Sequence, residues 1–222
     1  MEFAEVVRRR RMIRSYDPDR PVPREVVERL LEHATHAPSA GFSQGWAFLV
    51  LESDEDRERF WAATTPEPAD ELAAPGVTGD RAPSPWLAGM RRAPLVVVPL
   101  SNRSAYLDRY AEPDKGWTDR DESRWPVPYW HIDTGFAALL MLLTAVDEGL
   151  DACFFGIPPD RTDTFRAAFD VPDDYAPIGA ITVGYRAPDR RSPSLRRGRR
   201  PVEQVVHRGR WRSGGVAGSR QQ

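Results

Sequence analysis

The stretch A-P-S-A-G-F-S-Q-G-W, residues 37–46, decides the fold because it joins an amphipathic helix to an apolar strand. The helix ahead of it has one apolar face at helical spacing, formed by Val26, Val27, Leu30, Leu31 and Ala34. The strand after it is the apolar run Phe48–Leu51. The passage therefore predicts a helix, a shaped loop and a strand. A loop held between two such rigid elements can present backbone groups to a ligand.

The composition is that of a globular protein. A chain of 222 residues can bury a core, and we expect one domain over residues 1–211 and a disordered tail over 212–222. The formal net charge is only −2, and of the 31 basic residues all but Lys115 are arginine. Because the whole chain prefers arginine, its basic runs are weak evidence for nucleic-acid binding, which the negative net charge also disfavours.

The single cysteine bears on the compartment. Cys153 excludes an internal disulfide and lies in an apolar run, where a buried, inert thiol is expected. The N-terminal residues also lack the order of charged and apolar segments that marks a signal peptide. We therefore expect a cytoplasmic protein.

The longest apolar segment, Ile132–Val146, contains Asp133 and Thr144 and is too short for a bilayer span. It predicts a helix over 129–148 in a protein that has no membrane partner, ended by Gly149 in a left-handed cap. Its apolar residues cover nearly the whole circumference, so protein must cover the helix on all sides. That indicates a central core helix or one shared with a second subunit.

Further strands and a short helix complete the prediction. The apolar runs 95–100, 152–155 and 180–185 predict strands, and 158–169 predicts a short helix. Near-continuous apolar strands separated by helices indicate a sheet covered on both faces, in an α/β or α+β fold. The long connections near 65–85 and 110–128 are candidates for lids or partner arms.

The familiar signature motifs are missing from the sequence. It has no G-x-G-x-x-G, no G-x-x-x-x-G-K-[ST], no G-x-S-x-G and no H-E-x-x-H. His33 and His36 share a helix face, but no further ligand pattern accompanies them, and we assign no metal.

Segments at four places resemble, in chain order, the nitroreductase family of FMN enzymes. They are R-R-M-I-R-S-Y at 10–16, A-P-S-x-x-x-S-Q-x-W at 37–46, the helix and strand at 133–157, and R-G-R-R-P-V-E-Q-V-V-H at 197–207. The resemblance implies an α+β, three-layer fold with a central mixed sheet flanked by helices. It also implies a homodimer with the long core helix at the interface and two FMN molecules, each touched by both subunits.

The resemblance also implies cofactor contacts, residue by residue. The FMN phosphate falls to Arg10, Arg11, Arg14, Arg197 and Arg199, with Met12 where the family usually has serine. The flavin ring falls against Pro38, Ser39 and Ala40, in a loop whose shape is supported by Ser43, Gln44 and Trp46. Flavin N5 would meet the backbone of Phe155, Gly156 and Ile157. Phe42 and Gly45 replace the usual asparagine and proline. Taken alone, the 197–207 run could equally be a solvated or nucleic-acid-facing surface, and Gly156 could merely turn the chain.

The implied activity is hydride transfer from NADH or NADPH through flavin N5 to an electron-poor acceptor such as a nitroaromatic or a quinone. The flavin carries the chemistry, so no catalytic side chain is required. Candidates for an aromatic substrate pocket are Phe42, Trp117, Trp125, Tyr129 and Trp130, although aromatic clusters also arise from ordinary packing. Dehalogenating, desaturating and flavin-cleaving enzymes on this scaffold, a flavin-storage protein and a nucleic-acid-binding module stay open, as do the natural acceptor and a deazaflavin donor.

Overall fold

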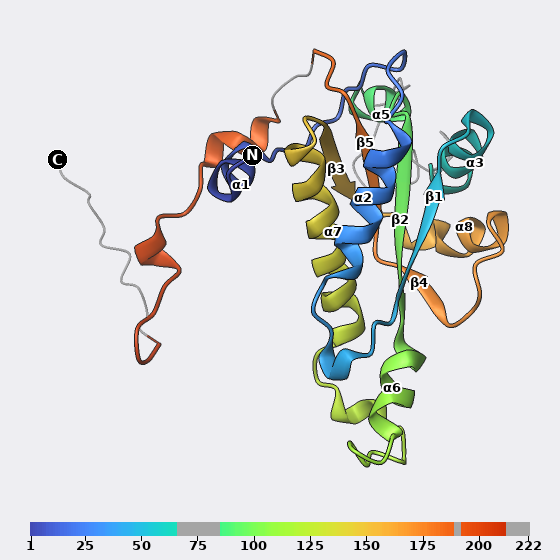
Figure 1. The fold of residues 1–222 in the computed structure, drawn as a ribbon, viewed down its shortest axis with the longest axis vertical. Coiled ribbons are helices and arrows are strands. Elements are labelled where there is room, and N and C mark those ends of the chain that lie inside the picture. The colour runs from blue at the N-terminus through green and yellow to red at the C-terminus, as the bar shows by residue number, and fades with distance from the viewer. Residues whose placement is uncertain (66–84, 189–191, 212–222) are drawn as a thin grey trace, which may run out of the picture. The chain divides into compact units, whose positions relative to one another are not determined.

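The computed structural model describes residues 1–65, 85–188 and 192–211 (Figure 1). By its internal contacts the chain divides into a large unit, Met1–Asp189, and a small unit, Arg190–Gln222. The predicted tail at 212–222 and most of the 65–85 connection lie outside the described residues. The single domain over 1–211 stays a prediction.

The large unit alternates helices and strands along the chain. Its helices are α1 (Phe3–Arg9), α2 (Arg24–Thr35), α3 (Asp54–Thr64), α5 (Pro85–Arg91), α6 (Arg103–Ala111), α7 (Tyr129–Asp147) and α8 (Thr162–Ala168). Its strands are β1 (Trp46–Leu51), β2 (Leu95–Asn102), β3 (Asp151–Phe155), β4 (Tyr175–Pro177) and β5 (Ala180–Gly184). Short 3-10 turns are η1 (Ala40–Phe42), η2 (Glu122–Arg124) and η3 (Pro159–Arg161), and the small unit has η4 (Pro193–Arg197) and η5 (Val202–Gln204).

The strands form one sheet in the order β1-β2-β5-β3, with β4 paired to β2. All ladders between these strands are antiparallel. Parallel pairing occurs at the isolated bridge between Met12 and Ala152, where the N-terminal segment joins the β3 edge. The predicted strands are confirmed, with ends that differ by one or two residues.

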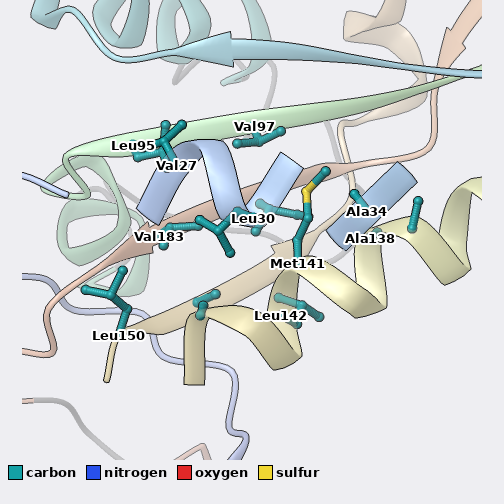
Figure 2. Packing of buried hydrophobic residues seen from close by; sticks show 14 of the residues in the cluster. Val27, Leu30, Ala34, Leu95, Val97, Ala138, Met141, Leu142, Leu150 and Val183 are labelled. Carbon is teal, nitrogen blue, oxygen red and sulfur yellow. The ribbon is translucent and has the colours of Figure 1, made fainter. Parts of the chain in front are cut away.

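The sheet lies between two layers of helices, which bury its two faces. Along β2, Leu95 and Val97 belong to the cluster under α2 and α7, whereas Val96 and Val98 belong to the opposite cluster with Phe60 of α3. This alternation follows from the two-residue period of a strand. Figure 1 shows α2 and α7 on one side of the sheet and α3 and α8 on the other, and Figure 2 shows Leu30 and Met141 packed together in the first cluster. The predicted three-layer α+β fold is confirmed, but the sheet is not the expected mixed one: its strands pair antiparallel, and parallel pairing is confined to the bridge between Met12 and Ala152.

Helix α7 is the central element of the first layer. It ends as predicted at Gly149, whose φ is +75°, while the N–H of Leu150 donates to the carbonyl of Ala145. Its length and composition would suffice to span a membrane, but 56% of the apolar window is buried inside this protein. One side stays uncovered in the single chain, where Phe136 and Leu139 are 42% and 45% exposed. Within one chain, therefore, only part of the apolar circumference of α7 is covered by protein.

Leu30→Ala tests the packing of α2 on α7. Leu30 is 1% exposed, so removing its side chain leaves a cavity that should lower the free energy of unfolding by about 2–5 kcal/mol. Urea denaturation followed by circular dichroism measures the loss. Glu32→Ala, on the exposed side of the same helix, should change it by less than about 0.5 kcal/mol, and an equal loss in both variants would contradict the assignment.

Candidate active site

The loop at residues 38–45 has an unusual backbone. Gly41, Phe42 and Gln44 all have left-handed conformations, with φ of 62°, 60° and 51°. A Cβ on Gly41 would lie 2.6 Å from the ring of Tyr110, and one on Gly45 would lie 2.6 Å from the ring of Tyr106. Both positions therefore require glycine, because the loop is pressed against α6.

A buried carboxylate anchors this loop. Asp133 in the first turns of α7 is 3% exposed, and its Oδ2 accepts from the Ala40 N–H at 2.8 Å and from the Tyr106 hydroxyl at 2.9 Å. Burial, and then this hydrogen bond, raise the pKa of Tyr106 well above its usual value, so the phenol stays a donor. Asp133 thereby joins α7, α6 and the loop at one point.

The loop also holds its own shape. The Ser39 Oγ accepts from the Gln44 N–H at 3.1 Å, and the Ser43 hydroxyl donates to the Ala40 carbonyl at 2.7 Å. The supporting roles expected for Ser43 and Gln44 have this geometric basis, and Trp46 begins β1 directly afterwards. Pro38 is exposed and Ser39 and Ala40 are half-buried, so the outer rim of the loop is open to solvent.

Phe42 is the exception in this rim. Its side chain is 75% exposed, and a bulky residue with positive φ costs about 1–2 kcal/mol. No aromatic ring within the described residues lies in ring contact with it. The fold therefore holds an exposed aromatic side chain in an unfavourable backbone conformation.

The arginine segment, residues 10–16, lies along the β3 edge. Met12 bridges Ala152, and its sulfur accepts from the Phe154 N–H at 3.4 Å. Met12, which stands where the family usually has serine, therefore packs against β3. The Arg11 guanidinium donates to the carbonyls of Arg8 and Arg10 at 2.6 and 2.8 Å. Arg10 differs, because its Nη1 is buried and has no hydrogen-bond partner within the described residues. An unsatisfied guanidinium nitrogen is suited to an anionic oxygen.

The residues proposed to meet flavin N5 follow the same strand. Phe155 ends β3, and Gly156 and Ile157 begin the connection to α8. A Cβ on Gly156 would meet nothing within 4 Å, so packing against the described chain gives no reason for glycine here. Close approach of a ligand to the backbone would give one.

The loop and the arginine segment lie near opposite ends of α7. Asp133 holds the loop near the N-terminal end, while Met12 bridges Ala152 just after the helix has ended. At 1.5 Å rise per residue, Asp133 and Ala145 are about 18 Å apart along the axis. Arg197 and Arg199 are exposed in the small unit, and their approach to the same phosphate stays a prediction.

Four of the five predicted pocket aromatics come together around Trp125, whereas Phe42 makes no ring contact with them. The ring centroid of Trp125 lies 5.7 Å from that of Trp117, 6.0 Å from Tyr129 and 6.1 Å from Trp130. Sequence reasoning missed Tyr106 and Tyr110, which belong to the same cluster, with Tyr110 4.6 Å from Trp125. Their spacing of four residues on α6 is the signal that could have found them.

Ion pairs hold the 110–128 connection, which contributes Trp117 and Trp125 to this cluster. The Arg109 guanidinium contacts Asp114 at 2.7 Å and Arg124 contacts Asp119 at 2.5 Å, and each pair lowers the pKa of its carboxyl. Arg103 pairs with Glu122 at 2.9 Å. Each exposed pair contributes little alone, but together they favour one arrangement of the segment.

A serine–histidine contact is present that the sequence did not reveal. The Ser101 Oγ lies 2.8 Å from the His131 Nδ1, and partial burial lowers the pKa of His131. Ser101 is only 1% exposed and its hydroxyl also reaches the Ala176 carbonyl at 3.3 Å. This hydroxyl is therefore placed to tie α7 to the sheet, not to attack a substrate.

Solved structures with the same fold define the class of protein. A provisionally named nitroreductase from Exiguobacterium sibiricum, solved in complex with FMN, has a TM-score of 0.68 at 21% identity, covering 96% of this chain and 98% of that one. A nitroreductase family protein from Clostridium difficile 630 has a TM-score of 0.65 at 22% identity, covering 95% of this chain and all of that one. The fold is therefore that of the nitroreductases.

Sequence comparison gives the particular family. The model of the nitroreductase family matches residues 7–185. A provisionally named NADH dehydrogenase/NAD(P)H nitroreductase from Methanothermobacter thermautotrophicus is 27% identical over 190 residues, covering 84% of this chain and 78% of that protein. The provisionally named NAD(P)H nitroreductase YodC from Bacillus subtilis is 24% identical over 184 residues, covering 81% and 87%. The chain belongs to the nitroreductase family of oxidoreductases.

Asp133→Ala tests the anchor of the loop. It leaves the Ala40 N–H and the Tyr106 hydroxyl without their acceptor, so the free energy of unfolding should fall by about 2–3 kcal/mol. Urea denaturation measures the change. Asp147→Ala, at the exposed end of the same helix, is the control and should have a smaller effect.

Tyr106→Phe gives a pH signature of the same contact. Because the pKa of Tyr106 is raised in the folded state above its ordinary value of 10.0, its contribution is complete below pH 10 and is lost as the pH rises further. The wild type should lose stability above pH 10 more steeply than Tyr106→Phe. Parallel curves for the two proteins would show that this phenol is not held as described.

Proposed function

We propose that the chain binds FMN and transfers hydride from NADH or NADPH to an electron-poor acceptor, such as a nitroaromatic or a quinone, in two half-reactions. The observation that carries the proposal is the buried Arg10 Nη1 without a partner, in a segment that the family resemblance assigns to the FMN phosphate. The FMN complex of a structural neighbour and the names of the relatives support it. We also propose a cytoplasmic location, in keeping with the lone, buried Cys153.

The residues of the chain would bind and orient the cofactor. Arg10, Arg11 and Arg14, joined by Arg197 and Arg199, would hold the phosphate, each charge-assisted hydrogen bond contributing about 1.5–3 kcal/mol. The backbone around Gly156 would give an N–H to flavin N5, with Phe155 and Ile157 beside it. Bound FMN supplies the redox chemistry, accepting and donating hydride at N5.

The anchored loop would form the other wall of the site. Pro38, Ser39 and Ala40 form its outer rim, and Asp133 fixes it on α7, so it can face a flat ring without rearranging. Phe42 and the accessible members of the cluster, Trp117, Trp125 and Tyr129, would supply aromatic surface for the acceptor, while Trp130, only 6% exposed, would support them from within.

A homodimer would bring these walls together. Within one chain the loop is anchored at Asp133, about 18 Å along the α7 axis from Ala145, whereas the arginine segment joins β3 after the helix has ended. The exposed face of α7 carries Phe136 and Leu139, and Phe3 and Val7 of α1 are 72% and 44% exposed. Contiguous exposed apolar side chains favour association. A second copy packed on α7 would cover them and place the loop of one chain beside the arginine segment of the other.

The colour of the purified protein tests the proposal. We expect a yellow protein whose 450 nm absorbance bleaches with NADH or NADPH and returns when menadione is added. Arg10→Ala with Arg199→Ala should weaken FMN binding to the apoprotein by at least about a hundredfold while the circular dichroism spectrum is unchanged, because two charge-assisted contacts are removed. Fluorescence quenching of FMN measures the affinity.

Arg24→Ala is the matched control for that variant. Arg24 is an exposed arginine on α2 that pairs only with Glu28 among the described residues, and its loss should leave FMN affinity unchanged. Tight FMN binding by the double variant would show that the phosphate lies elsewhere. A colourless wild type that takes up no FMN would refute the proposed function.

Leu139→Glu tests the dimer. A carboxylate on the exposed face of α7 would have to be buried without a partner, so the protein should become monomeric and lose FMN. Sedimentation velocity measures the oligomeric state. Trp86→Glu, which changes an exposed apolar side chain on α5, should stay dimeric, and a dimeric Leu139→Glu would place the interface elsewhere.

A further inference from the structure

The side chain of Arg109 joins two parts of the proposed acceptor site. Its Nε donates to the Gly41 carbonyl at 2.9 Å, and its Nη1 and Nη2 donate to the two carboxylate oxygens of Asp114 at 2.7 and 2.8 Å. A planar guanidinium makes both sets of bonds at once and keeps a fixed angle between them. Arg109 therefore ties the turn at 40–42 to the connection that follows α6.

We call this bridge from the Gly41 carbonyl through Arg109 to Asp114 the clamp. It acts on the peptide that precedes Phe42. The Gly41 carbonyl accepts from Arg109, and on the other side of the same peptide the Phe42 N–H donates to the Ser39 carbonyl at 3.0 Å. The ring of Tyr110 blocks movement of Gly41 toward α6. With this peptide plane held on both sides, the backbone at Phe42 is kept in its left-handed conformation, with φ of 60°, and this fixes the direction of the Cα–Cβ bond.

The clamp is better placed than an ordinary surface pair. The Arg109 side chain is only 25% exposed, and its Nη1 also reaches Glu112 at 3.2 Å. Its hydrogen bond with Asp114 raises the pKa of Arg109 and lowers that of Asp114. The residue whose backbone Arg109 holds is Phe42. Its side chain is 75% exposed and packs on no other ring of the described chain.

We propose that Arg109 is a positioning residue for Phe42, and that Phe42 held in this way sets acceptor selectivity by stacking on flat aromatic acceptors. This inference rests on the proposed function, because it needs a flavin beside the loop. The family resemblance gives no role to Arg109, which lies in the stretch between 65 and 129 where that resemblance is weak. A ring whose Cα–Cβ bond already points in one direction loses less conformational freedom when it stacks on an acceptor.

The first experiment measures the clamp without any cofactor. Hydrogen exchange of peptides covering residues 37–46 is followed by mass spectrometry in the full-length apoprotein. Arg109→Ala should speed exchange in this segment about tenfold or more, because a hydrogen bond to a charged group is lost. Arg103→Ala is the matched control on α6: within the described part of the chain it breaks the pair with Glu122 alone, and it should leave the segment unchanged.

The second experiment measures selectivity in the flavin-loaded enzyme. Phe42→Ala should raise KM for menadione about tenfold, because a stacking contact is lost, and should leave kcat/KM for ferricyanide, which is not flat, within about twofold. Arg109→Ala should give the same split. The double variant should be no worse than Phe42→Ala, because Arg109 acts through that side chain.

The outcomes separate this inference from the function on which it depends. Unchanged exchange in Arg109→Ala, equal effects of Arg103→Ala, or additive losses in the double variant would overturn the role of Arg109. Equal losses with menadione and ferricyanide would overturn the selectivity of Phe42. A wild type that binds no FMN would overturn the selectivity together with the proposed function, and the exchange experiment would still decide the clamp.

Discussion

The geometry of the candidate site depends on the carboxylate of Asp133. A buried charge is tolerated only when hydrogen bonds satisfy it, and here the donors come from a loop residue, Ala40, and from Tyr106 on α6. Neither donor is near Asp133 in sequence. The carboxylate therefore makes the position of the loop a consequence of where α7 lies on the sheet. The aromatic cluster is drawn into the same arrangement, because Tyr106 packs against Trp125 and Trp130.

Helix α7 connects the fold to the proposed assembly. One side supplies Ala137, Met141 and Ala145 to the core, and the other leaves Phe136 and Leu139 uncovered. The same helix separates the loop from the arginine segment, because its ends carry one group each. A single length of helix thus carries an apolar face that is uncovered within one chain and separates the two parts of the proposed cofactor site. In the proposed homodimer a second copy would cover that face and complete the site.

The sequence was informative where structure follows from local periodicity. Apolar runs predicted β1, β2, β3 and β5, helical spacing predicted α2 and α7, and Gly149 marked the end of α7. The antiparallel pairing, β4 and the contacts of Asp133 with Tyr106, Arg109 with Gly41 and Ser101 with His131 were not predictable in this way, since each joins residues at least 25 positions apart. Helix α6 was not predicted, although Tyr106 and Tyr110 are spaced for one face of it, because it is short and its charged residues Arg103 and Arg109 pair with acidic residues beyond the helix.

The backbone at position 42 gives a physical reason for the residue that relatives usually carry there. A left-handed conformation is tolerated by asparagine, whose short polar side chain can hydrogen-bond locally, but is unfavourable for phenylalanine. In this chain the left-handed conformation is held by the contact of Arg109 with the Gly41 carbonyl and by the Ser39 carbonyl, which accepts from the Phe42 N–H. These contacts are made by the backbone at the tip of the loop and do not use the Phe42 side chain. That side chain is 75% exposed and packs against no other ring of the described chain, so it is available to a molecule that approaches the loop.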